Sequence, residues 1–315
     1  MTTGESGPLR MLVVGAGRMG RAHLDAISRT DVVQVTAIVE PHEPTREQLA
    51  GVDAAVYADL QSALDAGGFD AALIAAPSGF HVGLVNTLME HAVPTLCEKP
   101  CGLHSDGIRD AAQRAANTGT RLQIGYWRRF VAELQTLRDE IETGLLGEIT
   151  LVQAWQWDGE PPEAGFRVTS GGPLLDMGVH EFDMIRWLTG QDIELVDVVD
   201  SRVNSVEPVA GDPESVLATA RLSGGGVAVI SLGRRFDRGD CCWVEVSGTL
   251  GSRRCEFMIG DAGNDVFQQA LVHQVEAFAA SVRGAAPLGA TAADAIAALE
   301  AVETGTPMFA NNPSS

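Results

Sequence analysis

Lys99 is the first candidate for a reactive side chain in this 315-residue sequence, because it is the only lysine among 22 basic residues. A desolvated lysine can give and take a proton near neutral pH, whereas arginine keeps its proton at any ordinary pH. Lys99 lies in the segment Glu98-Lys99-Pro100, directly after an apolar run. Either its amine is used in catalysis, or arginine replaced lysine throughout the chain and one residue survived by chance.

A second group of reactive side chains consists of Asp176, His180 and Asp183. Spacings of four and three residues put all three on one face of a helix. His180 can accept a proton near neutral pH while a carboxylate orients it or the substrate. A polar stripe with a hydrogen-bonded histidine, or a metal site, would also fit. The metal site is disfavoured because HExxH-type motifs need a second histidine that this segment lacks.

Residues 15–20 read Gly-Ala-Gly-Arg-Met-Gly, a GxGxxG pattern between a short apolar strand and a helix. In that context the pattern predicts a dinucleotide-binding turn, in which glycines let the backbone approach a pyrophosphate at a helix N-terminus. A purely structural glycine turn is the alternative. The predicted cofactor-binding residues of the turn are Gly15, Gly17, Arg18, Met19 and Gly20.

Glu40 lies 20 residues after Gly20, at the end of the next apolar run. A carboxylate at this position binds the ribose hydroxyls and repels a 2′-phosphate, so NAD is expected rather than NADP. Arg46 argues the other way, because a nearby arginine can bind that phosphate.

The elements that must position these residues alternate between strand and helix over residues 9–125, which predicts a doubly wound parallel sheet. Ligands of such sheets bind beyond the carboxyl ends of the strands. Pro77 and His81 follow one strand end, and Glu98 and Lys99 follow the next, on the nicotinamide side of the expected cleft. His81 would equally suit a helix start without a chemical role. The expected strands are Leu12–Val14, Val35–Val39, Ala71–Ala76, Pro94–Cys97 and Leu122–Gly125, and the expected helices are Gly20–Ser28, Phe80–His91 and Ser105–Asn117.

From residue 126 to residue 315 the sequence predicts an α+β domain on a largely antiparallel, open-faced sheet. Three consecutive glycines at 224–226 between two of its strands indicate a hairpin. The expected strands are Glu148–Trp157, Glu194–Val203, Val216–Leu222, Val227–Leu232 and Trp243–Ser247, and the expected helices are Val131–Glu142, Val266–Val282 and Ala292–Val302.

Composition restricts the possible partners and the compartment. The chain has 42 acidic residues against 22 basic ones, a formal charge of −20, which disfavours nucleic acid and anionic membranes as partners. Residues 1–10 contain no apolar signal-peptide core, and no apolar run approaches a membrane span. The five cysteines form no CxxC pair and no metal-ligand spacing, so free thiols in the cytoplasm are expected.

These motifs together resemble the glucose–fructose oxidoreductase/inositol dehydrogenase (Gfo/Idh/MocA) family over nearly the whole chain. The resemblance is carried by the glycine turn, Pro77 with His81, Glu98-Lys99-Pro100, Gly125-Tyr126 with Arg128-Arg129-Phe130, the segment 171–183, and Val246-Ser247-Gly248-Thr249 with Gly251. Ser78 and Trp127 stand where many members have asparagine, and Pro173 stands where many have a third glycine.

The resemblance implies a Rossmann domain (residues 9–125) and a substrate-binding and oligomerisation domain (residues 126–315). It implies hydride transfer between NAD and a hydroxyl of a cyclitol or sugar, in a homodimer or homotetramer. Lys99 would lie beside the nicotinamide, with Asp176 and His180 as its catalytic partners. The predicted substrate-binding residues are Tyr126, Trp127, Arg128, Trp157, Arg167 and Asp183, of which the two arginines would hold an anionic substituent unless they are merely solvent-exposed.

Other functions remain open at this point. An NADP-dependent ketosugar reductase would share the same motifs. A sensor that binds NAD without catalysis would have no use for both Lys99 and His180. A lyase or glycosidase that oxidises and then re-reduces its substrate would release product without net change of the cofactor.

Overall fold

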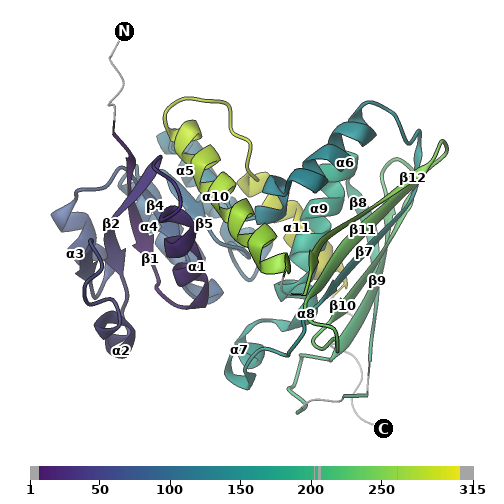
Figure 1. Cartoon of the computed structure of the whole chain (residues 1–315), viewed down its shortest axis with the longest axis horizontal. Helices are drawn as coiled ribbons and strands as arrows, with labels where there is room; N and C mark the ends of the chain where they lie inside the picture. Colours follow the sequence, from purple (N-terminus) through teal and green to yellow (C-terminus); the bar gives the residue numbers. More distant parts are fainter. Residues whose placement is uncertain (1–6, 202, 205–206, 261, 306–315) are drawn as a thin grey trace. The chain divides into compact units, whose positions relative to one another are not determined.

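The structure is a computed structural model that describes residues 7–201, 203–204, 207–260 and 262–305. The chain divides into two compact units, and each is described by itself (Figure 1). Unit 1 comprises residues up to 102, residues 106–126 and residues 268–293; unit 2 comprises residues 103–105, residues 127–267 and the C-terminal part from 294.

This division differs from the prediction in two segments: the short stretch 103–105, which belongs to unit 2, and residues 268–293. The predicted boundary at 125/126 is one residue from the observed change at 126/127, but residues 268–293 belong to unit 1 instead of the second domain. They carry most of helix α10 (Ala262–Val282), whose Val275, Phe278 and Ala279 pack in the same apolar core as Met11 and Leu73. The apolar surface of the helix, not its place in the sequence, decides where it packs.

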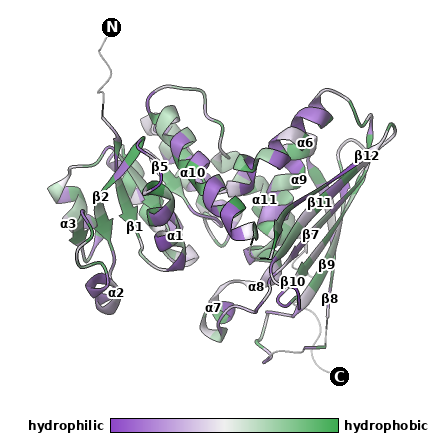
Figure 2. Cartoon of the chain, viewed as in Figure 1, coloured by the Kyte–Doolittle hydropathy of each residue, from purple (hydrophilic) through white to green (hydrophobic). Residues whose placement is uncertain are grey.

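The sheet of unit 1 is six-stranded and parallel, with the order β3-β2-β1-β4-β5-β6, as the alternation of strands and helices predicts. Every residue is buried in two of its inner strands, Ala71–Ile74 and Thr95–Cys97, and strands covered on both faces are typically apolar (Figure 2). The strands are β1 (Leu9–Val14), β2 (Val33–Val39), β3 (Ala55–Tyr57), β4 (Ala71–Ile74), β5 (Thr95–Cys97) and β6 (Leu122–Ile124).

The helices of unit 1 connect successive strands of this sheet. Strand β3 and helices α2 and α3 were not predicted, because β3 has only three residues, none of them buried, and α2 has no buried residue at all. These helices are α1 (Arg18–Ile27), α2 (Glu43–Glu47), α3 (Leu60–Ala66), α4 (His81–Glu90) and α5 (Ser105–Thr118), and the 3-10 turn η1 (Ser78–Phe80) precedes α4.

The sheet of unit 2 is also six-stranded, with the order β12-β11-β7-β10-β9-β8. Strands β10 and β7 are parallel and all other neighbours are antiparallel, which confirms the largely antiparallel sheet. The strands are β7 (Ile149–Trp157), β8 (Ile193–Asp200), β9 (Ser215–Leu222), β10 (Val227–Gly233), β11 (Cys241–Gly248) and β12 (Ser252–Ile259). Position 202, within the predicted strand 194–203, lies outside the described residues.

Helices cover one face of this second sheet. Helix α9 (Gly178–Thr189) packs on β7 and β10, and α6 (Ala132–Glu142) packs on α9 and β12. Alternate residues of β9 are buried on the helix side, while Leu217 on the other face is 44% exposed. The remaining elements are η2 (Trp127–Phe130), α7 (Ala164–Thr169), α8 (Gly172–Asp176) and α11 (Ala292–Gly305).

Candidate active site

The glycine turn between β1 and α1 has the geometry that a dinucleotide requires. A Cβ on Gly15 would lie 2.8 Å from the backbone of Ala75 and Ala76, and a Cβ on Gly20 would lie 2.1 Å from the Gly15 carbonyl oxygen. Both glycines therefore permit close packing of the turn against β4 and of α1 against the turn. A Cβ on Gly17 would meet nothing within 4 Å, so the open side of the turn is at Gly17, where helix α1 begins. Arg18 and Met19 form the first turn of this helix.

Glu40 lies directly after β2 and joins it to the glycine turn. Its Oε2 accepts a hydrogen bond from the Ala16 amide at 2.8 Å, and its Oε1 accepts one from the His42 amide at 2.9 Å. A carboxylate has about four acceptor positions, so these two bonds leave capacity for ribose hydroxyls. The Arg46 guanidinium donates to the carbonyl oxygens of Glu40 and Pro41. The residues present fit a dinucleotide without a 2′-phosphate.

Lys99 follows β5, in a turn that is held by a buried carboxylate. Glu98 is 4% exposed; its Oε1 lies 2.7 Å from His23 Nε2 of helix α1, and its Oε2 accepts from the Lys99 amide at 3.0 Å. Burial would raise the pKa of Glu98, but the His23 hydrogen bond and the neighbouring Lys99 charge hold it below its usual value. Glu98, predicted to bind the cofactor, thus makes its observed contacts to the protein and fixes the Lys99 backbone.

His81 connects the two strand ends at which the sequence predicts ligand binding. Its Nε2 lies 2.7 Å from the Ala76 carbonyl oxygen after β4, and its Nδ1 lies 2.7 Å from that of Pro100. Burial lowers the pKa of His81, while the two carbonyl acceptors favour the protonated ring. His81 therefore fixes the loop after Pro77 against the Glu98-Lys99-Pro100 turn.

In unit 2, Asp176 is the last residue of the five-residue helix α8, and His180 lies in the first turn of α9. Asp176 Oδ2 accepts a hydrogen bond from Arg234 Nη1 at 2.8 Å. The side chain of Asp176 is 16% exposed, and His180 is 6% exposed. The predicted continuous helix through both residues is interrupted at Met177, between α8 and α9.

Trp127 and Tyr126, predicted to bind substrate, are packed inside the protein. Trp127 is 6% exposed, and its ring lies edge-on to His180, Phe257 and Phe267, with centroid distances of 6.2, 6.3 and 5.0 Å. Tyr126 is 1% exposed. Trp127 therefore supports the ring of His180 from within the domain instead of forming an open wall.

The three charged residues predicted to bind substrate each form an ion pair within unit 2. Arg128 forms a buried ion pair with Glu181. Arg167 pairs with Asp212 and also donates to the Glu207 carbonyl. Asp183 accepts two hydrogen bonds from Arg129, at 3.0 Å from Nε and 2.6 Å from Nη2. A buried charge without a partner is costly, so these side chains are committed to one another.

Trp157 ends β7 and is partly exposed. Its Nε1 donates to Ser231 Oγ at 3.0 Å, and its ring lies edge-on to Phe236 at 6.2 Å. A Cβ on Gly233 would lie 2.3 Å from this ring, so glycine is required where β10 passes beneath it. Trp155, on the same strand, stacks on Trp243 at 5.2 Å and 8°.

Removing Arg128 is expected to test how strongly its buried ion pair is needed. Arg128→Met leaves Glu181, which is fully buried, without its counter-charge, and should lower the free energy of unfolding by about 3–5 kcal/mol. Adding Glu181→Met should recover most of that loss, because both charges are then gone. Urea unfolding of the single and double variants gives the values, with Arg114→Ala of the exposed Arg114–Glu90 pair as control, expected to cost less than about 1 kcal/mol. A single variant as stable as that control would contradict the assignment.

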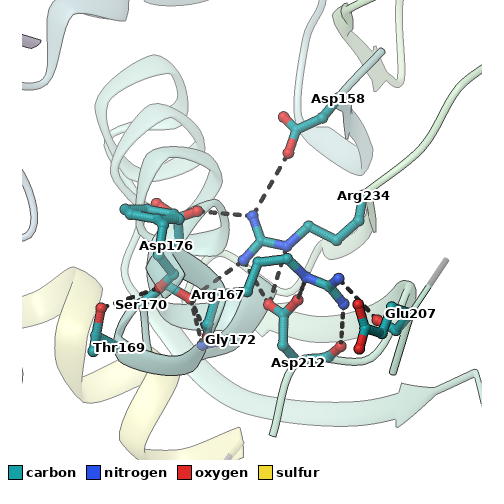
Figure 3. Close-up of polar contacts among 10 residues, drawn as sticks. Asp158, Arg167, Thr169, Ser170, Gly172, Asp176, Glu207, Asp212 and Arg234 are labelled. Carbon is teal, nitrogen blue, oxygen red and sulfur yellow. Dashed lines mark hydrogen bonds and ion pairs between the residues drawn. The ribbon is translucent and has the colours of Figure 1, made fainter. Parts of the chain in front are cut away.

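Three charged residues that contact one another in this region were not predicted: Arg234, Asp212 and Asp158. Arg234 is 0% exposed; Nε and Nη2 donate to Asp212 Oδ1 at 3.1 and 2.7 Å, and Asp158 Oδ2 lies 3.6 Å from Nη1 (Figure 3). The only sequence signal is an arginine directly after an apolar strand. Its partners lie 22 to 76 residues away, too far for any spacing rule to reveal them.

Asp158 should make stability depend on pH. Burial raises its pKa to about 6; the Arg234 charge opposes this shift, and the Asp176 and Asp240 charges add to it. A carboxyl whose pKa is raised above its unfolded value of about 3.9 stabilises the fold below that value and loses the contribution as pH rises through 6. Relative to wild type, Asp158→Asn should therefore gain stability between pH 4 and pH 7, on the order of 2 kcal/mol. Thermal unfolding of both proteins across this pH range measures the difference in stability. The control Asp237→Asn, at an exposed site, should show no pH-dependent difference from wild type. If the stability of Asp158→Asn also differs from wild type by a constant amount at every pH, the pKa of Asp158 is not raised.

Among the described residues, no set of three or more histidine, cysteine, aspartate or glutamate side chains is arranged to hold a metal ion. No helix in the described part of the chain is long and apolar enough to cross a membrane. All five cysteines are buried free thiols, as predicted.

Comparison with known proteins identifies the family. Residues 9–126 match the model of an oxidoreductase family with an NAD-binding Rossmann fold, and residues 134–254 match the GFO/IDH/MocA C-terminal domain. The chain is 45% identical to the rhizopine catabolism protein MocA of Rhizobium meliloti, over 96% of each chain. It is 26% identical to an inositol 2-dehydrogenase of Rhizobium meliloti, over 92% of this chain and 94% of the relative. It superposes on the Lactobacillus casei scyllo-inositol dehydrogenase solved with NAD(H) and scyllo-inositol, with a TM-score of 0.87 and 25% identity over 97% of this chain and 98% of the other. The chain belongs to the Gfo/Idh/MocA family of NAD-binding oxidoreductases.

Proposed function

We propose that this protein oxidises a secondary hydroxyl of a cyclitol, or reduces the corresponding ketone, with NAD as the hydride carrier. The observation that supports the proposal is the presence in one chain of a dinucleotide turn and two candidate reactive segments. These segments are the Lys99 turn, fixed by Glu98 and His81, and Asp176 with His180 on α8 and α9. The relatives with inositol dehydrogenase names support the cyclitol class.

NAD is the proposed cofactor because the chain offers it a matching set of groups. Gly17 opens the turn towards a pyrophosphate, and the amides at the start of α1 supply donors for it. Glu40 presents a carboxylate for ribose hydroxyls and would repel the extra phosphate of NADP. Arg46 makes its observed hydrogen bonds to two backbone carbonyls, which favours NAD over the NADP-dependent alternative.

Three residues are assigned roles in the reaction: one accepts a proton, one stabilises charge and one orients the substrate. Bound NAD supplies the acceptor for the hydride that leaves the substrate carbon. His180 takes the hydroxyl proton, and its ring is supported by Trp127. Lys99, as an ammonium, stabilises the oxygen on which negative charge develops. Asp176, held by Arg234, orients the substrate hydroxyls.

Among the predicted substrate contacts, Trp157 keeps that role in the proposal as an apolar wall for the ring. Tyr126 and Trp127 are assigned a supporting role without substrate contact, because both side chains are almost fully buried. Arg128, Arg167 and Asp183 are assigned to the interior ion pairs, so no anionic substituent of the substrate is required. Self-association into a dimer or tetramer and a cytoplasmic location stay predictions.

The test is the absorbance of reduced nicotinamide across a panel of inositol stereoisomers, aldoses and ketosugars, in both directions and with NAD and NADP. The proposal expects NAD-dependent turnover with at least one inositol or inosose. Binding of NAD without turnover on any compound would support the sensor. Product formation without net change of absorbance would support the lyase or glycosidase.

A further inference from the structure

Arg234 is an unusual residue for its position, because a fully charged guanidinium lies 0% exposed at the end of β10. Its amide donates to the Glu214 carbonyl at 2.8 Å, which continues the pairing of β10 with β9 by one residue. The backbone at this point needs no arginine. What the side chain contributes is its set of contacts with carboxylates.

Asp212 fixes the orientation of the guanidinium from one side. Its Oδ1 receives both Nε and Nη2 of Arg234, at 3.1 and 2.7 Å, and its side chain is completely buried. Arg167 of α7 pairs with the other oxygen, Oδ2, of the same carboxylate. A planar guanidinium that donates two hydrogen bonds along one edge has little rotational freedom, so its remaining nitrogen, Nη1, points in a defined direction.

That direction is towards Asp176. Nη1 donates to Asp176 Oδ2 at 2.8 Å, and Asp158 Oδ2 lies 3.6 Å from the same nitrogen (Figure 3). Arg234 thus links two carboxylates: Asp212, which is 0% exposed, and Asp176, which is 16% exposed and can be reached by a ligand.

Helix α8 fixes the backbone of Asp176 but not the orientation of its carboxylate. It has five residues, and Asp176 is the last of them. The same cluster of side chains also holds the start of this helix: Ser170 Oγ accepts from the Gly172 amide at 3.2 Å and from Arg234 Nη2 at 3.4 Å. A Cβ on Gly172 would lie 2.4 Å from the Gly211 carbonyl oxygen, next to Asp212. Arg234 therefore contacts the last residue of the short helix directly and reaches its first residue through Ser170.

We propose that Arg234 is a positioning residue for the reaction: anchored on Asp212, it holds the Asp176 carboxylate in the orientation in which that group binds the substrate. The inference rests on the proposed function, in which Asp176 contacts the substrate hydroxyls. Arg234 itself acts through Asp176 and is assigned no contact with substrate.

Arg167 provides a matched comparison for a purely structural role. Both arginines are buried, at 0% and 4% exposure, and both pair with Asp212. Arg234 also donates to Asp176, whereas Arg167 donates to Asp212 and to the Glu207 carbonyl. Arg234→Lys and Arg167→Lys each keep the positive charge and remove the planar fork. If these arginines serve folding alone, the two variants should lose similar stability and leave kcat similar.

The experiment is a double-mutant cycle on the intact enzyme, with the cyclitol that wild type turns over most efficiently. We expect Arg234→Lys to lower kcat by roughly a hundredfold, the cost of misplacing a reactive group by about 1 Å, with NAD affinity unchanged. Arg167→Lys should keep kcat close to wild type. In an Asp176→Asn background, Arg234→Lys should have almost no further effect on kcat, because the group through which it acts has been altered.

The outcomes separate the inference from the function on which it rests. A wild type that turns over no compound of the panel contradicts the proposed function. With an active wild type, equal kcat for the Arg234 and Arg167 variants, or independent effects of Arg234→Lys and Asp176→Asn, overturns the inference alone. If Arg234→Lys does not fold, Asp212→Asn replaces it in the cycle, since it loosens the anchor and keeps both arginines. It should then lower kcat in the wild-type background only, and an unchanged kcat overturns the inference.

Discussion

Replacing Lys99 by arginine is expected to reduce kcat by about two to three orders of magnitude, the usual cost of removing a group that stabilises developing negative charge on oxygen. Arginine keeps the positive charge, but its wide planar head cannot take the place of a compact ammonium beside the reacting oxygen. The backbone of the turn is held by Glu98, His23 and His81, so the substitution leaves the surrounding structure intact. Steady-state kinetics with the best cyclitol and NAD measures the loss.

Two controls accompany the Lys99 variant. The dissociation constant for NAD should stay within a small factor of wild type, because Lys99 acts on the substrate in the proposal. Arg114→Lys, an exchange of the same two residue types on the exposed surface of α5, should leave kcat unchanged. Near-normal turnover of Lys99→Arg would remove Lys99 from the chemistry and restore chance survival as the explanation of the single lysine.

Gly17→Ala is expected to weaken NAD binding without weakening the fold. Gly17 has φ −70°, which alanine adopts freely, and an added Cβ meets nothing within 4 Å in the protein itself. The methyl group would instead occupy the space into which the pyrophosphate must come close to the backbone. We expect the dissociation constant for NAD to rise at least about tenfold, equivalent to about 1.4 kcal/mol. Fluorescence titration with NADH and thermal unfolding of the unliganded protein measure the two quantities.

The matched control for this variant is Gly83→Ala, within helix α4. Its added Cβ also meets nothing within 4 Å, and the site is outside the glycine turn. It should bind NAD as wild type does and gain about 0.4–1 kcal/mol of stability, because alanine restricts the unfolded chain. If Gly17→Ala binds NAD as tightly as this control, the pyrophosphate does not approach the turn at Gly17.

The sequence predicted the parallel sheet and its glycine turn because local rules suffice there. A strand buried on both faces must be continuously apolar, and a tight strand-to-helix turn requires glycines at set positions. The distance from Gly20 to Glu40 spans one helix and one strand, so the carboxylate could be placed at the end of β2. Strand β3 and helix α2 escaped prediction, since residues with little burial leave no apolar pattern.

The domain boundary shows where local rules stop. Residues 268–293 follow the second sheet in the sequence, yet Val275 and Phe278 pack in the core of the first unit. An apolar helix reveals that it must be buried, but not which core buries it. Strand β12 gave a weak signal for a related reason: three of its first four residues are exposed or charged, because it lies at the edge of its sheet.

By itself, the sequence singled out the candidate reactive side chains: one lysine at a strand end, and an aspartate and a histidine four residues apart. Only the tertiary structure decided what the charged residues around them do. Arg128 and Arg167, predicted to hold substrate, pair with carboxylates 53 and 45 residues away, and Arg234 reaches Asp176 across 58 residues. A buried charge must meet an opposite charge, and which two meet depends on the order of strands and helices in space. Spacing along the chain carries no record of that order.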